Sequence, residues 1–435
     1  MVFSRVVPPP PPPPPASNVP VWTQSPDQRI CYVVRHPWEW VMNNMAHAAM
    51  ESMDMPSALP SSLLAAAAVP ANATPASARR RRTSRRERGL HPATLKLEIV
   101  HGTDIVYAVH GTSAAFDGLE DKDELVRTMQ RWGCDHLKLS PPSVLINWDV
   151  THEECLNVVG KQLPAVESNK DANVVAVLKE PMGSQGQGIF FVKNAEEIHV
   201  VIEEHRQRAE AEPAFLDNLI EAKGRIPSWV LQAEVVPSLL IFDGRKFHIR
   251  TYVVAVENLD HPDLVDVFVY NRHEVRVAGV PVPPDGGTER DRKAYITNGA
   301  LSTTTQRVLI DQVEELMSRN LKSATEAFVA ETFGKHLLPD FGGRVRCTQL
   351  DNDGPTPIRK FAMAGLDLMV TEDNRLYLLE VNANPAAPRE NTITEDFANH
   401  LKGFWRDLVN LVTDVDAPNF VPVKDILQQH GLLDS

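Results

Sequence analysis

Hydrophobic and polar positions along the chain predict short strands that alternate with helices from residue 95 onward. In the first such region, runs of β-branched and aromatic residues predict strands at 95–100, 105–109 and 143–147, and amphipathic patterns predict helices at 119–132 and 153–162. This order of elements indicates a small α/β lobe.

The pattern continues through a second and a third region. In the second, strands are predicted at 174–178, 189–192, 229–236 and 246–256, with a polar helix from Ala195. In the third, we predict a long helix at 306–333, two paired strands within 364–382 and an amphipathic helix at 396–412. The whole pattern predicts a mixed α/β (α+β) fold.

Residues 1–90 have a different composition, which predicts a disordered tail. Pro8–Pro15 form an unbroken proline run, and residues 57–78 are mostly Ala, Pro and Ser, a composition that cannot bury a hydrophobic core. The tail closes on Arg79–Arg88, which holds seven arginines and one acidic residue. A solvated linker, a nuclear import signal and a docking site for an acidic partner are all compatible with this basic run.

Charge and cysteine content narrow the classes of function. The 435 residues include 44 Lys and Arg against 57 Asp and Glu, a formal net charge of -13, which argues against binding nucleic acid over the whole surface. The four cysteines lack the spacing of a disulfide framework or a zinc site. No early segment has the roughly 20 apolar residues of a membrane helix. We expect a soluble cytoplasmic protein that does not contact a membrane.

The most informative candidate residues lie in the predicted paired strands, where charged residues interrupt apolar runs. Asp367 lies between two leucines, and Glu380 and Asn382 follow two leucines on the second strand. With a four-residue turn at 371–374, Asp367 is expected opposite Leu378, on the same face as Glu380 and Asn382. Three oxygen ligands on one face would suit Mg²⁺. Alternatively, the carboxylates are exposed at a sheet edge or pair with Lys or Arg.

A glycine-rich loop supplies candidate phosphate ligands. Gly183, Gly186 and Gly188 could present backbone N–H groups to a phosphate, and Lys179 ends the preceding strand. The spacing matches neither a Rossmann nor a Walker A motif. The alternative to a phosphate site is therefore a plain hairpin turn at the glycines and an exposed lysine at the end of the strand.

The strand predicted at 246–256 carries a cationic face. Lys246, His248 and Arg250 alternate with apolar residues, so their side chains lie on one side of the strand. Such a face could neutralise a phosphoryl group, although a half-solvated strand would have the same pattern. Arg276 and Asn298 are further polar candidates.

These blocks occur in the order typical of one enzyme family. The glycine loop, Lys179, Gln232, Gly244–Arg250, Thr297–Asn298, Gly365-x-Asp367 and Leu379–Asn382 together resemble the tubulin tyrosine ligase-like family of the ATP-grasp superfamily. The resemblance runs from about residue 174 to residue 387. It implies an ATP-grasp fold and an ATP- and Mg²⁺-dependent carboxylate–amine ligase.

The resemblance also implies roles for the candidate residues. The residues implied to contact ATP are Lys179, Gly183, Gly186, Gly188, Gln232, Lys246 and His248. Those implied to act on the phosphates or the acyl intermediate are Arg250, Arg276 and Asn298, and those implied to hold Mg²⁺ are Asp367, Glu380 and Asn382. The implied domains are a tail at 1–90, an α/β lobe at 91–165, a central ATP-grasp lobe at 166–258, a C-terminal lobe with the magnesium site at 259–416 and an extension at 417–435.

The implied reaction joins a free amino acid to a protein carboxylate through an acylphosphate, with tubulin as the expected acceptor and a location at microtubules. The sequence VNANPAAP at 381–388 is closer to the ending of tyrosine ligase than to that of glutamylases, which favours tyrosine slightly over glutamate or glycine. His248 and Tyr295 stand where Asp and His are usual in the family. A ligase of small molecules and a degenerate, microtubule-binding relative are the alternatives.

Overall fold

The structure is a computed structural model of the 435-residue chain. It describes residues 21–24, 30–34, 105–111, 119–131, 136–162, 176–181, 188–211, 220, 225–258, 265–283, 292–297, 305–337, 358–383, 385, 394–412 and 416–432. The strand predicted at 95–100, most of the predicted tail, Gly183, Gly186 and Asn298 lie outside these ranges.

The chain divides into two compact units, each described by itself. One comprises Met1–Gly111 with Gly354–Ile358, and the other Thr112–Asp353 with Arg359–Ser435. In the first unit, β1 (Val21–Gln24) pairs antiparallel with β2 (Ile30–Val34), and β2 pairs parallel with β3 (Ile105–Gly111). β1 and β2 lie within residues 1–90, where composition predicts a disordered tail. Both are short runs of β-branched and aromatic residues, whose strand preference outweighs the proline-rich surroundings.

The second unit contains a small antiparallel sheet with the strand order β4-β7-β5-β6. These strands are β4 (Ser143–Ile146), β5 (Ala176–Lys179), β6 (Ile189–Val192) and β7 (Trp229–Ala233). The helices α5 (His152–Gln162) and α7 (Ala195–Ala211) contribute Val159 and Ile198 to a core that includes Trp229. These strands and helices confirm the predicted elements, with ends that shift by a few residues.

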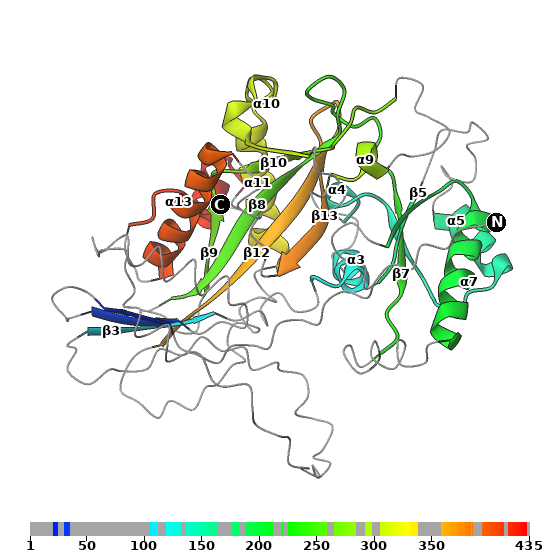
Figure 1. The fold of residues 1–435 in the computed structure, drawn as a ribbon, viewed down its shortest axis with the longest axis horizontal. Helices are drawn as coiled ribbons and strands as arrows, with labels where there is room; N and C mark the ends of the chain where they lie inside the picture. Colours follow the sequence, from blue (N-terminus) through cyan, green and yellow to red (C-terminus); the bar gives the residue numbers. More distant parts are fainter. Residues whose placement is uncertain are drawn as a thin grey trace, which may run out of the picture. The chain divides into compact units, whose positions relative to one another are not determined.

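A larger sheet of antiparallel strand pairs forms the rest of the second unit, with β8 at its centre (Figure 1). β12 pairs with one edge of β8, whereas β9 and β10 pair with the other; β13 lies beyond β12, β11 beyond β10 and β14 beyond β9. The strands are β8 (Phe247–Glu257), β9 (Val265–Tyr270), β10 (Glu274–Val277), β11 (Gln306–Leu309), β12 (Ile358–Val370), β13 (Leu376–Ala383) and β14 (Phe420–Pro422).

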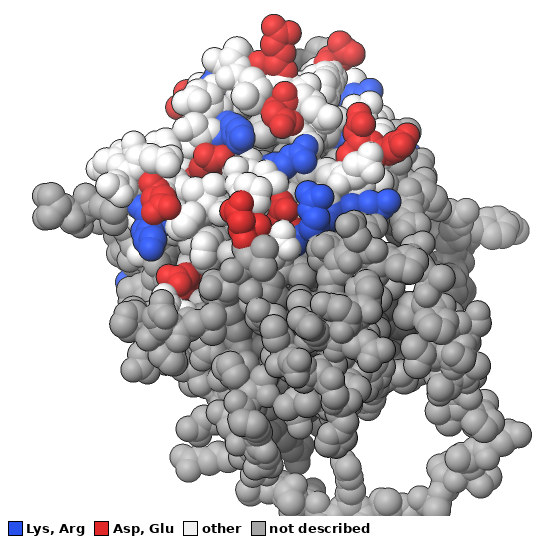
Figure 2. Space-filling view, turned by 90° about the vertical axis from the view of Figure 1, so that its left-hand side faces the viewer, with Lys and Arg blue, Asp and Glu red and all other residues white. Residues whose placement is uncertain are grey.

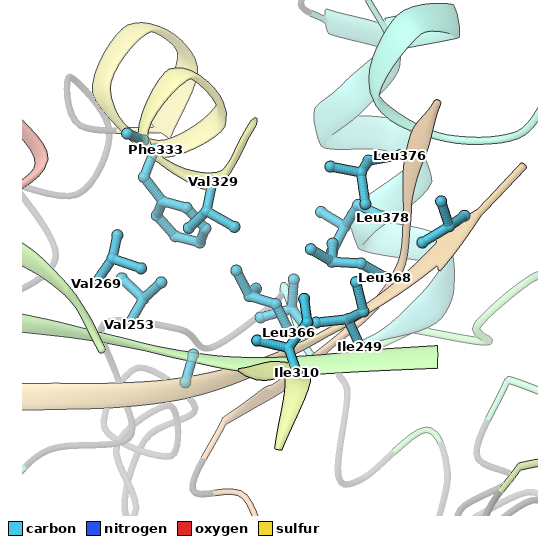
Figure 3. Close-up of a cluster of buried hydrophobic side chains, with 14 of the residues drawn as sticks. Ile249, Val253, Val269, Ile310, Val329, Phe333, Leu366, Leu368, Leu376 and Leu378 are labelled. Atoms are coloured by element: carbon cyan, nitrogen blue, oxygen red, sulfur yellow. The ribbon is translucent and has the colours of Figure 1, made fainter. Parts of the chain in front are cut away.

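One face of this sheet packs into the main hydrophobic core. Alternate residues of β8, such as Ile249 and Val253, lie in one core with Val329 of α11 (Leu321–Glu331) and Phe333 of the π-helical turn Thr332–Leu337 (Figure 3). The helix α14 (Val423–Gln429) adds Val423, Ile426 and Leu427 to this core. Because side chains alternate along a strand, the other residues of β8 lie on the opposite face.

The opposite face is divided between an aromatic part and a polar part. α13 (Glu395–Val412) covers the aromatic part, where the rings of Phe404 and Tyr252 lie 4.6 Å apart. Towards the start of β8, this face carries His248 and Arg250 in place of aromatic residues. The polar candidates of the sequence therefore lie beside a region from which water is excluded.

The helix predicted at 306–333 is wrong over its first residues and is broken further along. Gln306–Leu309 forms the strand β11, a 3-10 turn follows at Ile310–Gln312, and α10 (Glu314–Ser318) precedes α11. Pairing with β10 holds the first four residues extended, and Asn320 separates α10 from α11 with a φ of 55°. Tertiary pairing outweighs the helical pattern here.

The remaining helices are short and surround the site described below. They are α3 (Lys122–Arg131), α4 (His136–Leu139) and α9 (Arg292–Tyr295). In the described part of the chain, no helix combines the length and the apolar character needed to span a bilayer.

Candidate active site

The hairpin of β12 and β13 brings Asp367 and Glu380 directly opposite each other. The register shifts between Asp367 and Leu368, so the predicted pairing of Asp367 with Leu378 is wrong; Leu378 pairs with Leu368. The cause is a bulge that leaves Leu379 without a partner in the ladder. The two carboxylates face each other across the strand pair instead of lying on a diagonal.

Asp367 is held by a set of basic and polar donors. The Arg250 guanidinium donates from Nε to Oδ1 at 2.5 Å and from Nη2 to Oδ2 at 2.8 Å. Nδ2 of Asn382 donates to Oδ2 at 3.3 Å. Nε2 of His248 lies 3.2 Å from Oδ1 without the alignment of a hydrogen bond, while its Nδ1 bonds to Thr297. The structure thus brings three of the predicted residues together around the carboxylate of a fourth.

The electrostatics of this cluster fix the charges of both partners. Burial opposes ionisation of Asp367, but the positive charge of Arg250 and the neighbouring His248 hold its pKa well below the ordinary value. Burial likewise opposes the charge of Arg250. The attraction to Asp367 more than offsets this effect of burial and raises the pKa of the guanidinium. Only 13% of the Asp367 side chain and 6% of the Arg250 side chain are exposed. They form a buried ion pair with two parallel hydrogen bonds.

A pocket joins Glu380 to two further predicted residues. Nζ of Lys179 donates to Oε1 of Gln232 at 2.8 Å and to the Leu379 carbonyl at 3.4 Å. Lys179, Gln232 and Glu380 line a small pocket, whose apolar wall includes Met129 of α3. Burial lowers the pKa of Lys179 to about 8, although the Glu380 carboxylate favours its charged form. The pocket combines an apolar wall with convergent polar groups, as ligand sites do.

Lys246 lies at the start of β8 and has a carboxylate partner that the sequence did not suggest. Its Nζ is 2.6 Å from Oε1 of Glu234 and 4.7 Å from the centroid of the Tyr295 ring. Glu234 is two residues after Gln232, so strand periodicity from β7 could have placed both on one face. Tyr295, which departs from the family pattern, packs on the lysine as an aromatic partner of a cation.

Gly188 is the described end of the glycine-rich loop. It has a φ of 66°, a conformation that favours glycine, and its carbonyl accepts a 2.7 Å bond from the N–H of Glu180. This bond closes the two strands β5 and β6 around the loop. Nη1 of Arg292 in α9 donates to the carbonyl of Ile189 at 2.6 Å and fixes the start of β6.

Arg276 also has an acidic partner that sequence reasoning missed. Its Nε and Nη2 lie 3.2 and 2.9 Å from Oε2 of Glu274, while the Tyr252 hydroxyl donates to Oε1 at 2.7 Å. Nε2 of His400 in α13 lies 3.7 Å from Oε1. Burial opposes the charge of Glu274, but Arg276 and these donors lower its pKa. The sequence signal that could have revealed this partner is a glutamate in β10, a strand that also contains two valines.

Asp367 pairs with Arg250, as the alternative to a metal site predicts, while the chemistry of the three oxygen ligands predicted for Mg²⁺ fits that ion. Asp367 and Glu380 are paired across the strands, and Asn382 contacts Asp367 from the same strand as Glu380. In the described part of the chain, no three His, Cys, Asp or Glu side chains form a metal-binding group on their own. A magnesium ion at this place would therefore need the amide oxygen of Asn382 as a third hard oxygen donor.

Gly365 lets the Arg250 side chain lie close against β12. A Cβ placed on Gly365 would lie 2.8 Å from Cβ of Pro385 and 3.0 Å from Nη1 of Arg250. We expect Gly365→Ala to displace the guanidinium and to cost about 1–3 kcal/mol of unfolding free energy, as overpacking does. Urea denaturation would measure this cost, and Gly403→Ala, where a Cβ meets nothing within 4 Å, is the matched control. Equal stability of the two variants would contradict the expectation.

Comparison with known proteins places this site in a family context. The probable tubulin–tyrosine ligase PBY1 of Saccharomyces cerevisiae is 26% identical over 284 residues, which cover 57% of this chain and 36% of PBY1. The chain thus matches little more than a third of that curated relative. A second similar protein is the C-terminal domain of K. lactis Pby1, whose crystal structure is described as that of an ATP-grasp enzyme interacting with the mRNA decapping enzyme Dcp2. It aligns with a TM-score of 0.42 and 17% identity, and the alignment covers 71% of this chain and 79% of that chain.

The family model extends across the second unit and includes every candidate site residue. The model of the tubulin-tyrosine ligase family matches residues 119–419, well over half of the chain. This match confirms the resemblance inferred from the ordered motifs. The chain belongs to the tubulin-tyrosine ligase family.

Proposed function

We propose that this chain is an ATP- and Mg²⁺-dependent ligase of the ATP-grasp type that joins an amino acid to a protein carboxylate. The observation that carries the proposal is the pocket where Lys179, Gln232 and Glu380 meet, next to the buried Asp367–Arg250 pair. Family membership supports ligase chemistry. The arrangement of these side chains supports the use of a nucleotide.

The residues that line the pocket are of the types that bind the base of ATP. Leu125 and Met129 of α3 supply an apolar wall for a flat ring, and Lys179 and Gln232 supply a donor and an amide at its edge. The glycine loop ending at Gly188 would cover the phosphates with backbone N–H groups.

The charge balance of the site supports a need for a divalent cation. Among the described residues, four basic side chains face four carboxylates, so their charges cancel; they are Lys179, Lys246, Arg250 and Arg276 against Glu234, Glu274, Asp367 and Glu380. A triphosphate brings negative charge that this balance does not offset. Mg²⁺ held by Asp367, Glu380 and Asn382 would supply the missing positive charge.

The proposed reaction has two steps and needs no protein nucleophile. An oxygen of the acceptor carboxylate bonds to the γ-phosphorus as the bond to the bridging oxygen breaks, and ADP leaves. The amine of the second substrate then attacks the acyl carbon, loses a proton, and inorganic phosphate leaves. Arg250 and Arg276 are fixed by Asp367 and Glu274, so their guanidinium groups are oriented before the substrate arrives. We propose tyrosine as the amino acid and tubulin as the acceptor.

Incorporation of labelled amino acids tests this function. The full chain with ATP and Mg²⁺ is expected to transfer labelled tyrosine, and less readily glutamate or glycine, to purified tubulin, and EDTA should stop the transfer. Glu380→Gln should abolish incorporation, whereas Glu372→Gln, an exposed glutamate in the turn of the same hairpin, should not. No incorporation of any of the three amino acids by a chain that binds Mg²⁺-ATP would contradict the tubulin acceptor.

A further inference from the structure

A row of three basic side chains crosses the polar face of the larger sheet. On β10, Arg276 pairs directly with His248 of β8 on one side and with Arg307 of β11 on the other. Residues that pair directly in an antiparallel ladder point to the same face. Arg307 therefore extends the polar face that carries His248 and Arg276, one strand beyond the residues considered so far.

Arg307 differs from the other arginines of this face because, among the described residues, no acidic side chain forms an ion pair with it. Arg250 is bound by Asp367, and Arg276 is bound by Glu274. Nη1 of Arg307 is buried and has no hydrogen-bond partner within the described part of the chain. The Glu274 oxygens already receive bonds from Tyr252 and Arg276. Arg307 therefore adds an unpaired positive charge to this face.

This arrangement is costly for the chain without a ligand. A buried donor that loses its water without gaining an acceptor is destabilising, and so are like charges directly opposite each other on neighbouring strands. Burial and the charge of Arg276 together lower the pKa of Arg307 to about 10. An anion at Arg307 would remove both penalties.

Arg307 lies on a strand far from the one that carries Glu380. Four strand spacings separate β13 from β11, through β12, β8 and β10. At about 4.8 Å for each spacing, the two backbones lie about 19 Å apart. This separation favours an anion from another substrate at Arg307 over the phosphates of a nucleotide at Glu380.

We propose that Arg307 binds a carboxylate group of one of the two substrates other than ATP, which are the acceptor and the free amino acid. A planar guanidinium matches the two oxygens of a carboxylate and can bind both at once. The proposal rests on the proposed function, in which both the acceptor and the free amino acid carry carboxylates. On the face seen in Figure 2, acidic and basic side chains are interspersed over the described surface, so an acidic ligand finds no uniformly basic patch there.

The test measures carboxylate binding without nucleotide, so that it does not depend on ligase activity. The probes are a fluorescent hexaglutamate peptide for the acceptor, and free L-tyrosine and L-glutamate for the amino acid. The full chain is compared with Arg307→Gln, Arg307→Lys and Arg319→Gln, in which Arg319 is a surface arginine bonded to Asn374. ATP binding with Mg²⁺ and the melting temperature are recorded for each variant.

We expect Arg307→Gln to weaken the peptide or the amino acids by at least about tenfold, the loss typical of a bond to a charged group. The probe whose affinity falls identifies the substrate that supplies the carboxylate. Arg307→Lys should keep part of the affinity, and Arg319→Gln all of it. ATP binding should stay within twofold, and the melting temperature of Arg307→Gln should equal or exceed that of the parent, because an unpaired charge is removed.

Three results would overturn the proposal. They are equal affinity of the parent and Arg307→Gln for every probe, a parent that binds none of the probes, and a fall in melting temperature with ATP and carboxylate binding weakened alike. Failure of the proposed function would look different: the parent would bind a carboxylate probe through Arg307 and yet incorporate no amino acid with ATP.

Discussion

An Asp367→Asn variant is expected to lose about 3–5 kcal/mol of unfolding free energy, the cost of leaving one partner of a buried ion pair uncompensated. Arg250 would keep its charge in a place where 6% of its side chain is exposed, and an amide cannot accept both of its bonds as a carboxylate does. Urea denaturation of the full chain at neutral pH, followed by tryptophan fluorescence, measures the loss.

A double replacement separates the charge effect from packing. Arg250→Met with Asp367→Leu removes both charges and is expected to recover most of the loss, because an apolar pair leaves no charged group without a partner.

The stability of the parent is also expected to depend on pH. A carboxyl group whose pKa is lowered on folding stabilises the protein above its unfolded pKa, and this stability is lost as the pH falls through the folded pKa. The parent should therefore approach the Asn variant below about pH 4. A variant as stable as the parent at neutral pH would show that the pair contributes nothing.

A Glu380→Gln variant is expected to lose at least about 100-fold in magnesium-dependent ATP affinity. Replacing a residue that only contacts the ligands of a metal costs about 10- to 100-fold in affinity, and Glu380 is proposed to bind the metal directly. Glu380 is the carboxylate that faces both the pocket and Asp367. Calorimetric titration with ATP, in MgCl₂ and again in EDTA, measures the magnesium-dependent part. Glu372→Gln serves as the matched control in the same hairpin. Equal affinity of parent and variant in MgCl₂ would remove Glu380 from the metal site.

The elements that carry the site were predictable because their patterns are local. The alternation of Lys246, His248 and Arg250 with apolar residues is enough to predict β8 and its polar face. The same holds for the strands that carry Asp367 and Glu380. A charged residue in an apolar strand is visible in any reading of the sequence.

The hairpin register could not be predicted because a bulge has no clear local signal. Strict period two places Leu378, Glu380 and Asn382 on one face, yet Leu378 and Val381 both lie in the core. The extra residue at Leu379 moves Glu380 to the face of the pocket. Without the bulge, Glu380 would share the face of Leu378 and point into the hydrophobic core.

The partners of the basic residues were also out of reach of sequence reasoning. Asp367 and Arg250 are 117 residues apart, and only the pairing of β12 with β8 makes them neighbours. Glu274 and Arg307 become relevant only once the strand order β8-β10-β11 is known. The residue types were visible, whereas the pairing of their charges depends on topology.

The division of the sheet face has a consequence for how much of the chain the site needs. Phe404 and His400 of α13 keep water from Tyr252 and Glu274, and in a region of low dielectric the Glu274–Arg276 attraction is strong. A chain shortened to end at about residue 390 would retain every candidate side chain named above. It would lose α13, admit solvent to Glu274 and release Arg276 from its fixed orientation, so the catalytic unit extends beyond the last motif that defines it.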